Sequence, residues 1–133
     1  MPAPEQMSMP QLYDVIYHAL ALGDSTLQIW TSFTFALIVA VHLAGDRIAR
    51  STYRLGSSLY ALLSLVLVLR YCGDAYQILH YQKLLVERRF EPWPVPDILG
   101  VLIGVGTFTL MVGGTIGTLW FARTSRSRAE ENT

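Results

Sequence analysis

A run of 24 residues without a charged side chain, from Ile98 to Phe121, constrains this chain more than any other feature. A helix of that length is about 36 Å long, which is enough to cross the ~30 Å hydrocarbon core of a bilayer with some tilt. Two further apolar stretches, Leu27 to Ala44 and Leu55 to Leu69, then become candidate spans. The sequence therefore predicts an all-α integral membrane protein with three transmembrane helices.

The composition agrees with a chain that is largely surrounded by lipid. Charged residues make up 15% of it, against about 25% in a typical soluble domain. Ten basic and ten acidic residues cancel, so nothing points to a nucleic-acid partner. The single cysteine, Cys72, excludes an intrachain disulfide and a multi-cysteine metal site. No phosphate-binding loop, nucleotide fingerprint or catalytic motif is present, so we expect neither an enzyme nor a bound metal or cofactor.

Residues 10–22 predict a separate amphipathic helix at the N-terminus. The segment Ser8-Met9-Pro10-Gln11 fits a helix start, with Ser as the N-cap and Gln as its capping-box partner. Gly23-Asp24 is expected to break this helix before span 1, which covers residues 27–44. The short helix cannot cross a bilayer, so it either lies on the membrane surface or packs against a neighbouring helix.

Span 2 is predicted over residues 55–71, with a helical extension beyond the bilayer to about residue 88. No proline or strong turn signal lies between Leu55 and Phe90, whereas three alternating prolines follow. Span 3 is expected over residues 97–121. The polar residues 123–133 predict a flexible tail.

The basic residues predict the orientation. The first connection carries Arg47, Arg50 and Arg54, and the C-terminal tail carries Arg123, Arg126 and Arg128. Three spans place both segments on the same side, which the positive-inside rule makes cytoplasmic. The other side carries four basic residues, spread out and mixed with acidic ones (Arg70, Lys83, Arg88, Arg89). We expect a multi-pass protein of the inner (plasma) membrane with its N-terminus outside.

Two pairs of polar residues are candidates for chemistry. Arg70 and Asp74 stand one helical turn apart at the outer end of span 2. They form either a snorkelling arginine with its counter-ion, or part of an ion path or a polar contact to another subunit. His42 and Asp46 repeat this spacing at the cytoplasmic end of span 1, as an interfacial pair or a proton relay.

Span 3 contains two small-xxx-small pairs, Gly100–Gly104 and Gly113–Gly117. Such pairs let two helix backbones approach closely. The first pair shares a face with Thr107 and Met111. The pattern predicts contact either with spans 1 and 2 or with a second copy or another membrane protein.

Three short motifs carry a resemblance: Leu12-Tyr13-Asp14, Trp30 followed by Phe35 to Ala40, and Leu67 to Tyr71. In them the chain resembles a loose set of small, uncharacterised three-span bacterial inner-membrane proteins. The resemblance covers about residues 12–71 and implies no particular activity.

These features favour a protein that acts by helix–helix association, as an accessory subunit or homo-oligomer. One alternative is an oligomeric channel or small transporter that uses Arg70, Asp74 and His42. Another is a redox or metal protein in which His18 and His80 meet.

The outer face is expected to carry a small cap. There Ile16 and Leu20 would pack against Ile78 and Leu79, because water opposes exposure of both apolar stripes. The cap would leave a polar surface for a partner (Asp14, His18, Asp74, His80 and Lys83).

Overall fold

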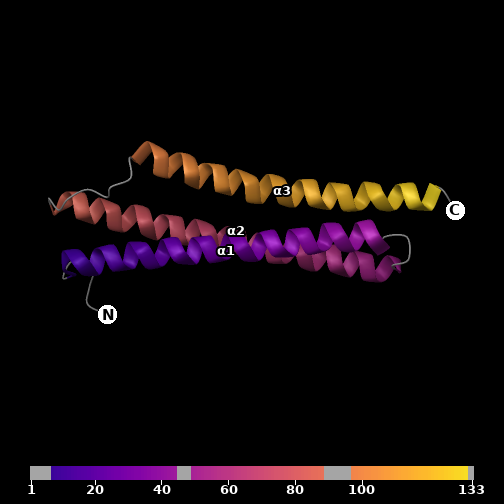
Figure 1. Ribbon diagram of the computed structural model, residues 1–133, viewed down its shortest axis with the longest axis horizontal. Helices are drawn as coiled ribbons and strands as arrows, with labels where there is room; N and C mark the ends of the chain where they lie inside the picture. Colours follow the sequence, from indigo (N-terminus) through magenta and orange to yellow (C-terminus); the bar gives the residue numbers. More distant parts are fainter. Residues whose placement is uncertain (1–6, 45–48, 89–96, 132–133) are drawn as a thin grey trace.

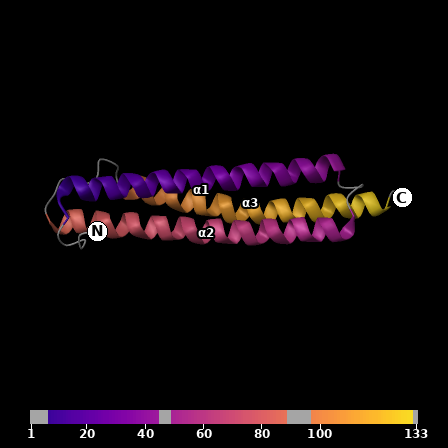
Figure 2. The ribbon, with the colours of Figure 1, turned by 90° about the horizontal axis from the view of Figure 1, so that it is seen from below.

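The described part of the chain is a bundle of three long helices. The structure, a computed structural model, describes residues 7–44, 49–88 and 97–131, and within them no strand occurs. Helices α1 (Met9–Ala44), α2 (Arg50–Glu87) and α3 (Asp97–Glu131) run the length of the molecule and alternate in direction (Figures 1 and 2). Each is long and apolar enough to cross a membrane. The predicted all-α fold with three spans is therefore confirmed.

Helix α1 begins as the sequence predicts but continues where a break was expected. The backbone N–H of Ser8 donates to Oε1 of Gln11 at 2.8 Å, which is the predicted capping box. The predicted break at Gly23-Asp24 is wrong, because residues 10–22 and span 1 form one helix. The hydroxyls of Ser25 and Thr26 do not cap a new helix; each donates to the carbonyl four residues earlier, at 2.9 Å. A glycine costs a helix only about 1 kcal/mol, which packing on both sides of Gly23 outweighs.

Helix α2 confirms the predicted extension of span 2, since it is continuous from Arg50 to Glu87. Helix α3 corrects the prediction for the tail. It continues to Glu131, so the described part of residues 123–133 is helical. Residues 118–131 contain no glycine or proline that would end a helix, and Ala122 is buried. The helix therefore continues past Phe121.

Two apolar clusters hold the helices together. The first, which we call the membrane cluster, joins all three helices through Trp30, Leu67 and Met111. The second, the cap cluster, joins the start of α1 to the end of α2. It consists of four buried residues, with further side chains packed against it (Met7, Leu12, Ile16 and Leu85; Tyr13, Val15, Ile78 and Tyr81).

The cap cluster confirms the predicted cap in part. Ile16 is buried and Ile78 packs against the cluster, as expected. Leu20 and Leu79, however, are 40% and 59% exposed, so this second pair does not close the cap. The guanidinium of Arg88 instead donates to the carbonyl of Met7 at 2.6 Å and ties the two ends together.

Candidate functional site

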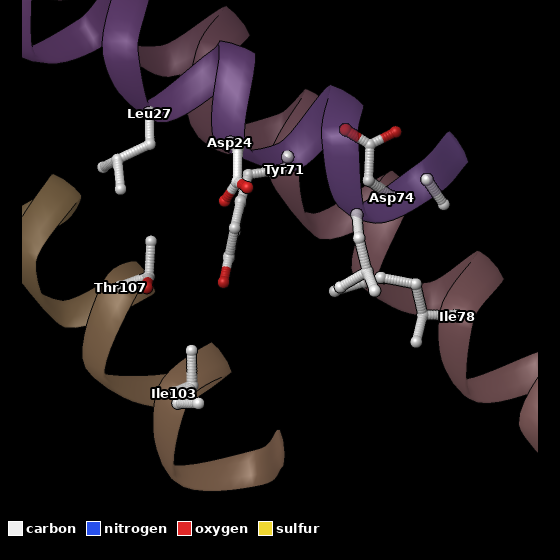
Figure 3. Close-up of a pocket in the computed structure, with 11 residues that line it drawn as sticks. Asp24, Leu27, Tyr71, Asp74, Ile78, Ile103 and Thr107 are labelled. Atoms are coloured by element: carbon white, nitrogen blue, oxygen red, sulfur yellow. The ribbon is translucent and has the colours of Figure 1, made fainter. Parts of the chain in front are cut away.

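A cavity of about 110 Å³ lies between the first half of α3 and the other two helices. Its apolar lining comes from all three helices and includes Leu27, Ile78 and Ile103. Its polar lining consists of two carboxylates, Asp24 and Asp74, together with the hydroxyl groups of Tyr71 and Thr107. Figure 3 shows Asp24 and Tyr71 reaching from α1 and α2 toward Thr107 of α3, with Asp74 further along α2 toward Ile78.

The cavity lies where α3 diverges from the other two helices, before its buried positions Met111, Thr118 and Ala122. At Gly114 a Cβ atom would stand 2.6 Å from Cη2 of Trp30, so the indole ring lies directly on this backbone. At Gly100 and Gly104, by contrast, no atom lies within 4 Å of where a Cβ would be. In Figure 1 the Asp97 end of α3 stands further from the other helices than its opposite end does.

Polar side chains connect the helices around this cavity. The indole N–H of Trp30 donates to Oγ1 of Thr115 at 3.1 Å. The hydroxyl of Tyr71 donates to the carbonyl of Gly104 at 3.4 Å, which is the longest of these contacts. One turn after Trp30 along α1, the hydroxyls of Thr34 and Tyr60 lie 2.8 Å apart. Each of these bonds joins two different spans.

The predicted pair of Arg70 and Asp74 is not an ion pair. The only salt bridge among the residues described joins Lys83 to Glu87, and it is exposed. The Arg70 side chain is exposed on the surface of α2, whereas Asp74 is half-buried at the cavity. Oδ2 of Asp74 is buried and has no hydrogen-bond partner within the described ranges.

The other predicted candidates are not brought together. His42 is exposed in the last turn of α1, about 27 Å along the helix from Asp24, and Asp46 lies outside the described residues. His18 and His80 are both exposed; the His80 ring stacks on that of Tyr76 at 6.4 Å. Among the described residues no group of three or more potential metal-binding side chains occurs.

The glycine pairs of α3 face two different directions. Gly100 and Gly104 lie three and two turns before Met111, on the side that faces the other helices. Gly106, Gly113 and Gly117 lie on one side of the helix, rotated by about 120° to 160° from the buried Met111. They therefore point away from α1 and α2. These three glycines have nothing within 4 Å of a Cβ position, and we call them the outer glycine face.

Asp24 was not predicted as a site residue from the sequence, because the pair Gly23-Asp24 was interpreted as the end of a helix. A signal was present: the buried positions Leu12, Ile16, Ala19, Thr26 and Trp30 keep three- and four-residue spacing when Gly23 is counted among them. This continuous stripe indicates one helix, with Asp24 on its flank.

No protein-family model, curated protein or solved structure matches this chain. The function must therefore be inferred from these residues alone.

Proposed function

We propose that this chain is a non-enzymatic small membrane protein that acts by helix–helix association, as a homo-oligomer or as an accessory subunit of another membrane protein. The observation behind the proposal is the outer glycine face of α3. Only 6% of the most apolar stretch of α3 is buried, against 17% for α1 and for α2. The helix with the most glycines is therefore the least covered one.

Lipid tails are as apolar as a leucine side chain, so burying apolar surface gives two membrane helices little reason to associate. Helix association in a membrane depends on close van der Waals packing and on hydrogen bonds between helices, and glycines permit the closest approach. Among the glycines that the structure describes, Gly114 makes the closest such contact, against Trp30. Gly106, Gly113 and Gly117 offer the same kind of contact to a helix from outside.

The orientation belongs to the same proposal. The arginines near Ser51 and in the C-terminal part of α3 would lie in the cytoplasm, and the cap cluster would lie outside the inner membrane. The exposed polar residues of the cap, including His18, His80 and Lys83, would then face a partner on the outer side.

Two measurements on the protein purified in detergent test the proposal. Light scattering gives the mass of the particle, and co-purification identifies any protein bound to it. We expect an oligomer or a defined complex, and we expect Gly113→Leu or Gly117→Leu to reduce it to the monomer. Gly56→Leu is the matched control, because Gly56 of α2 also has nothing within 4 Å of a Cβ position. A monomer without a partner, or equal behaviour of all three variants, would contradict the proposal.

A further inference from the structure

The outer glycine face of α3 points outward on the side of α3 that is nearer to α1. Around the helix, its three glycines lie about 60° to 100° from Gly114, which touches Trp30 of α1. They lie about 140° to 180° from Gly104, whose carbonyl accepts a hydrogen bond from Tyr71 of α2. A helix that docks on this face therefore passes beside α1 and lies opposite α2.

Three polar residues of α1 lie on the flank that such a helix would pass. Asp24, Gln28 and Thr31 are exposed and lie within about 60° of one another around α1. Asp24 identifies this flank as the one beside α3, because it lines the cavity together with Ile103 and Thr107 of α3. We call the three residues the polar stripe of α1, and we call the stripe and the outer glycine face together the α1–α3 surface.

The polar stripe lies near the middle of the membrane. Trp30 is level with Gly114, because its ring lies on that glycine, and α1 and α3 run in the same direction. Asp24 precedes Trp30 by six residues, so it is level with a point six residues before Gly114. That point is about 15 Å from Ile98 and about 20 Å from Phe121, the two ends of the apolar run of α3.

At this depth lipid cannot satisfy the two longer side chains of the stripe. Ionisable residues within a membrane face other protein or water, and they pair with one another. Among the residues described, Asp24 has no salt bridge and the side-chain amide of Gln28 has no hydrogen bond. The hydroxyl of Thr31, by contrast, donates to the carbonyl of Leu27 at 2.9 Å. A partner at this surface must therefore supply hydrogen-bond donors and, for Asp24, a positive charge.

A second copy of the chain does not bring that charge to the α1–α3 surface. Residues 98–121 of α3 carry no charged side chain, and residues 25–44 of α1 contain no lysine or arginine. The basic residue nearest to this depth, Arg70, belongs to α2, which lies opposite the outer glycine face. Charge complementarity therefore favours a different protein as the occupant.

We propose that the α1–α3 surface binds a transmembrane helix of another membrane protein, and that this helix carries a lysine or arginine at the depth of Asp24. The helix packs on the outer glycine face, its basic group pairs with the carboxylate of Asp24, and Gln28 hydrogen-bonds to it. The inference rests on the proposed association through α3 and chooses between its two forms: the chain is an accessory subunit. The ion pair also selects the partner, because a helix without the basic residue leaves Asp24 unpaired.

The test measures the binding of model transmembrane peptides to the full chain in lipid vesicles. Two leucine-alanine peptides differ only at their central position, which is lysine in one and methionine in the other. Energy transfer from a dye on Cys72, which is exposed on α2, to a dye on the peptide gives the bound fraction. We expect the lysine peptide to bind about tenfold more tightly than the methionine peptide, as one polar contact between membrane helices allows.

Variants of the chain assign the effect to Asp24. Asp24→Asn should remove the preference for the lysine peptide and leave binding of the methionine peptide unchanged, which also verifies that the variant folds. Asp14→Asn is the matched control, since Asp14 is an exposed carboxylate of α1 that lies about 15 Å further toward its start. Gln28→Leu should weaken binding of the lysine peptide less than Asp24→Asn does.

Three results would overturn the proposal: equal binding of the two peptides, a preference for lysine that survives in Asp24→Asn, or a dimer of the chain that only Asp24→Asn disrupts. The last result would identify a second copy as the occupant. Gly113→Leu separates this inference from the association itself, because it should weaken binding of both peptides. If it does so while the two peptides bind equally, the association through α3 stands and only the ion pair is wrong.

Discussion

At the residue scale, one tryptophan fixes how α3 sits on the bundle. Trp30 is buried, its ring lies over the backbone of Gly114, and its N–H donates to Thr115. Thr115 in turn donates to the carbonyl of Met111 at 2.7 Å, so its hydroxyl is held in place. Trp30 also belongs to the membrane cluster, where it packs with Leu67 of α2 and Met111 of α3. Its partners are 84 and 85 residues away in the chain, and spacing along the sequence does not reveal such contacts.

Substitution of Gly114 by alanine is expected to destabilise the protein by about 1–3 kcal/mol. The added Cβ would lie 2.6 Å from Cη2 and 2.9 Å from Cζ2 of Trp30, and the ring cannot withdraw without losing its bond to Thr115. Gly113→Ala is the control, since nothing lies within 4 Å there and alanine favours the helix. Unfolding midpoints in a mild detergent compare the two variants, and equal midpoints would show that the close contact is not formed.

At the scale of the elements, what was predictable depended on local signals. The start of α1 could be predicted because Ser8 and Gln11 interact within one turn. The length of α2 could be predicted because nothing in its sequence interrupts a helix. The continuity of α1 was missed because the break signal Gly23-Asp24 was given more weight than the apolar stripe that continues from Leu12 to Trp30. The cavity could not be predicted either, since it depends on how α3 leans away from α1 and α2.

The cap cluster gives an element-scale prediction. A cysteine pair at Ile16 and Ile78, in a Cys72→Ser background, should form a disulfide under mild oxidation, because both side chains belong to this cluster. The pair of Ile16→Cys with Leu79→Cys should not, since Leu79 is 59% exposed and faces away. Gel mobility under non-reducing conditions measures both. If neither pair cross-links, residues 9–20 lie on the membrane surface instead of packing on α2.

At the scale of the whole molecule, the bundle has a covered side and an open side. Helices α1 and α2 pack together in the cap cluster and, with α3, in the membrane cluster. Helix α3 packs on them through buried positions from Met111 to Ala122 and leaves the outer glycine face open. This asymmetry is the basis of the proposed association. The glycine pattern in the sequence left open whether α3 contacts the other two helices or a second protein.

The proposed orientation predicts which residues a membrane-impermeant maleimide reaches in intact spheroplasts that lack Cys72. Asp14→Cys should react from outside, because the cap cluster lies there in the proposed topology. Ser51→Cys, exposed at the start of α2, should react only after permeabilisation. The opposite pattern would reverse the topology while leaving the fold as it is.

The most direct test of the association is cross-linking of the outer glycine face in native membranes. Gly113→Cys in the Cys72→Ser background should give a disulfide-linked dimer, or a defined adduct with another membrane protein, under mild oxidation. Leu62→Cys is the control, since Leu62 is 59% exposed on α2 but lies outside the outer glycine face. We predict efficient cross-linking at Gly113 and little at Leu62. Equal cross-linking at the two positions, or none at Gly113, would contradict association through α3.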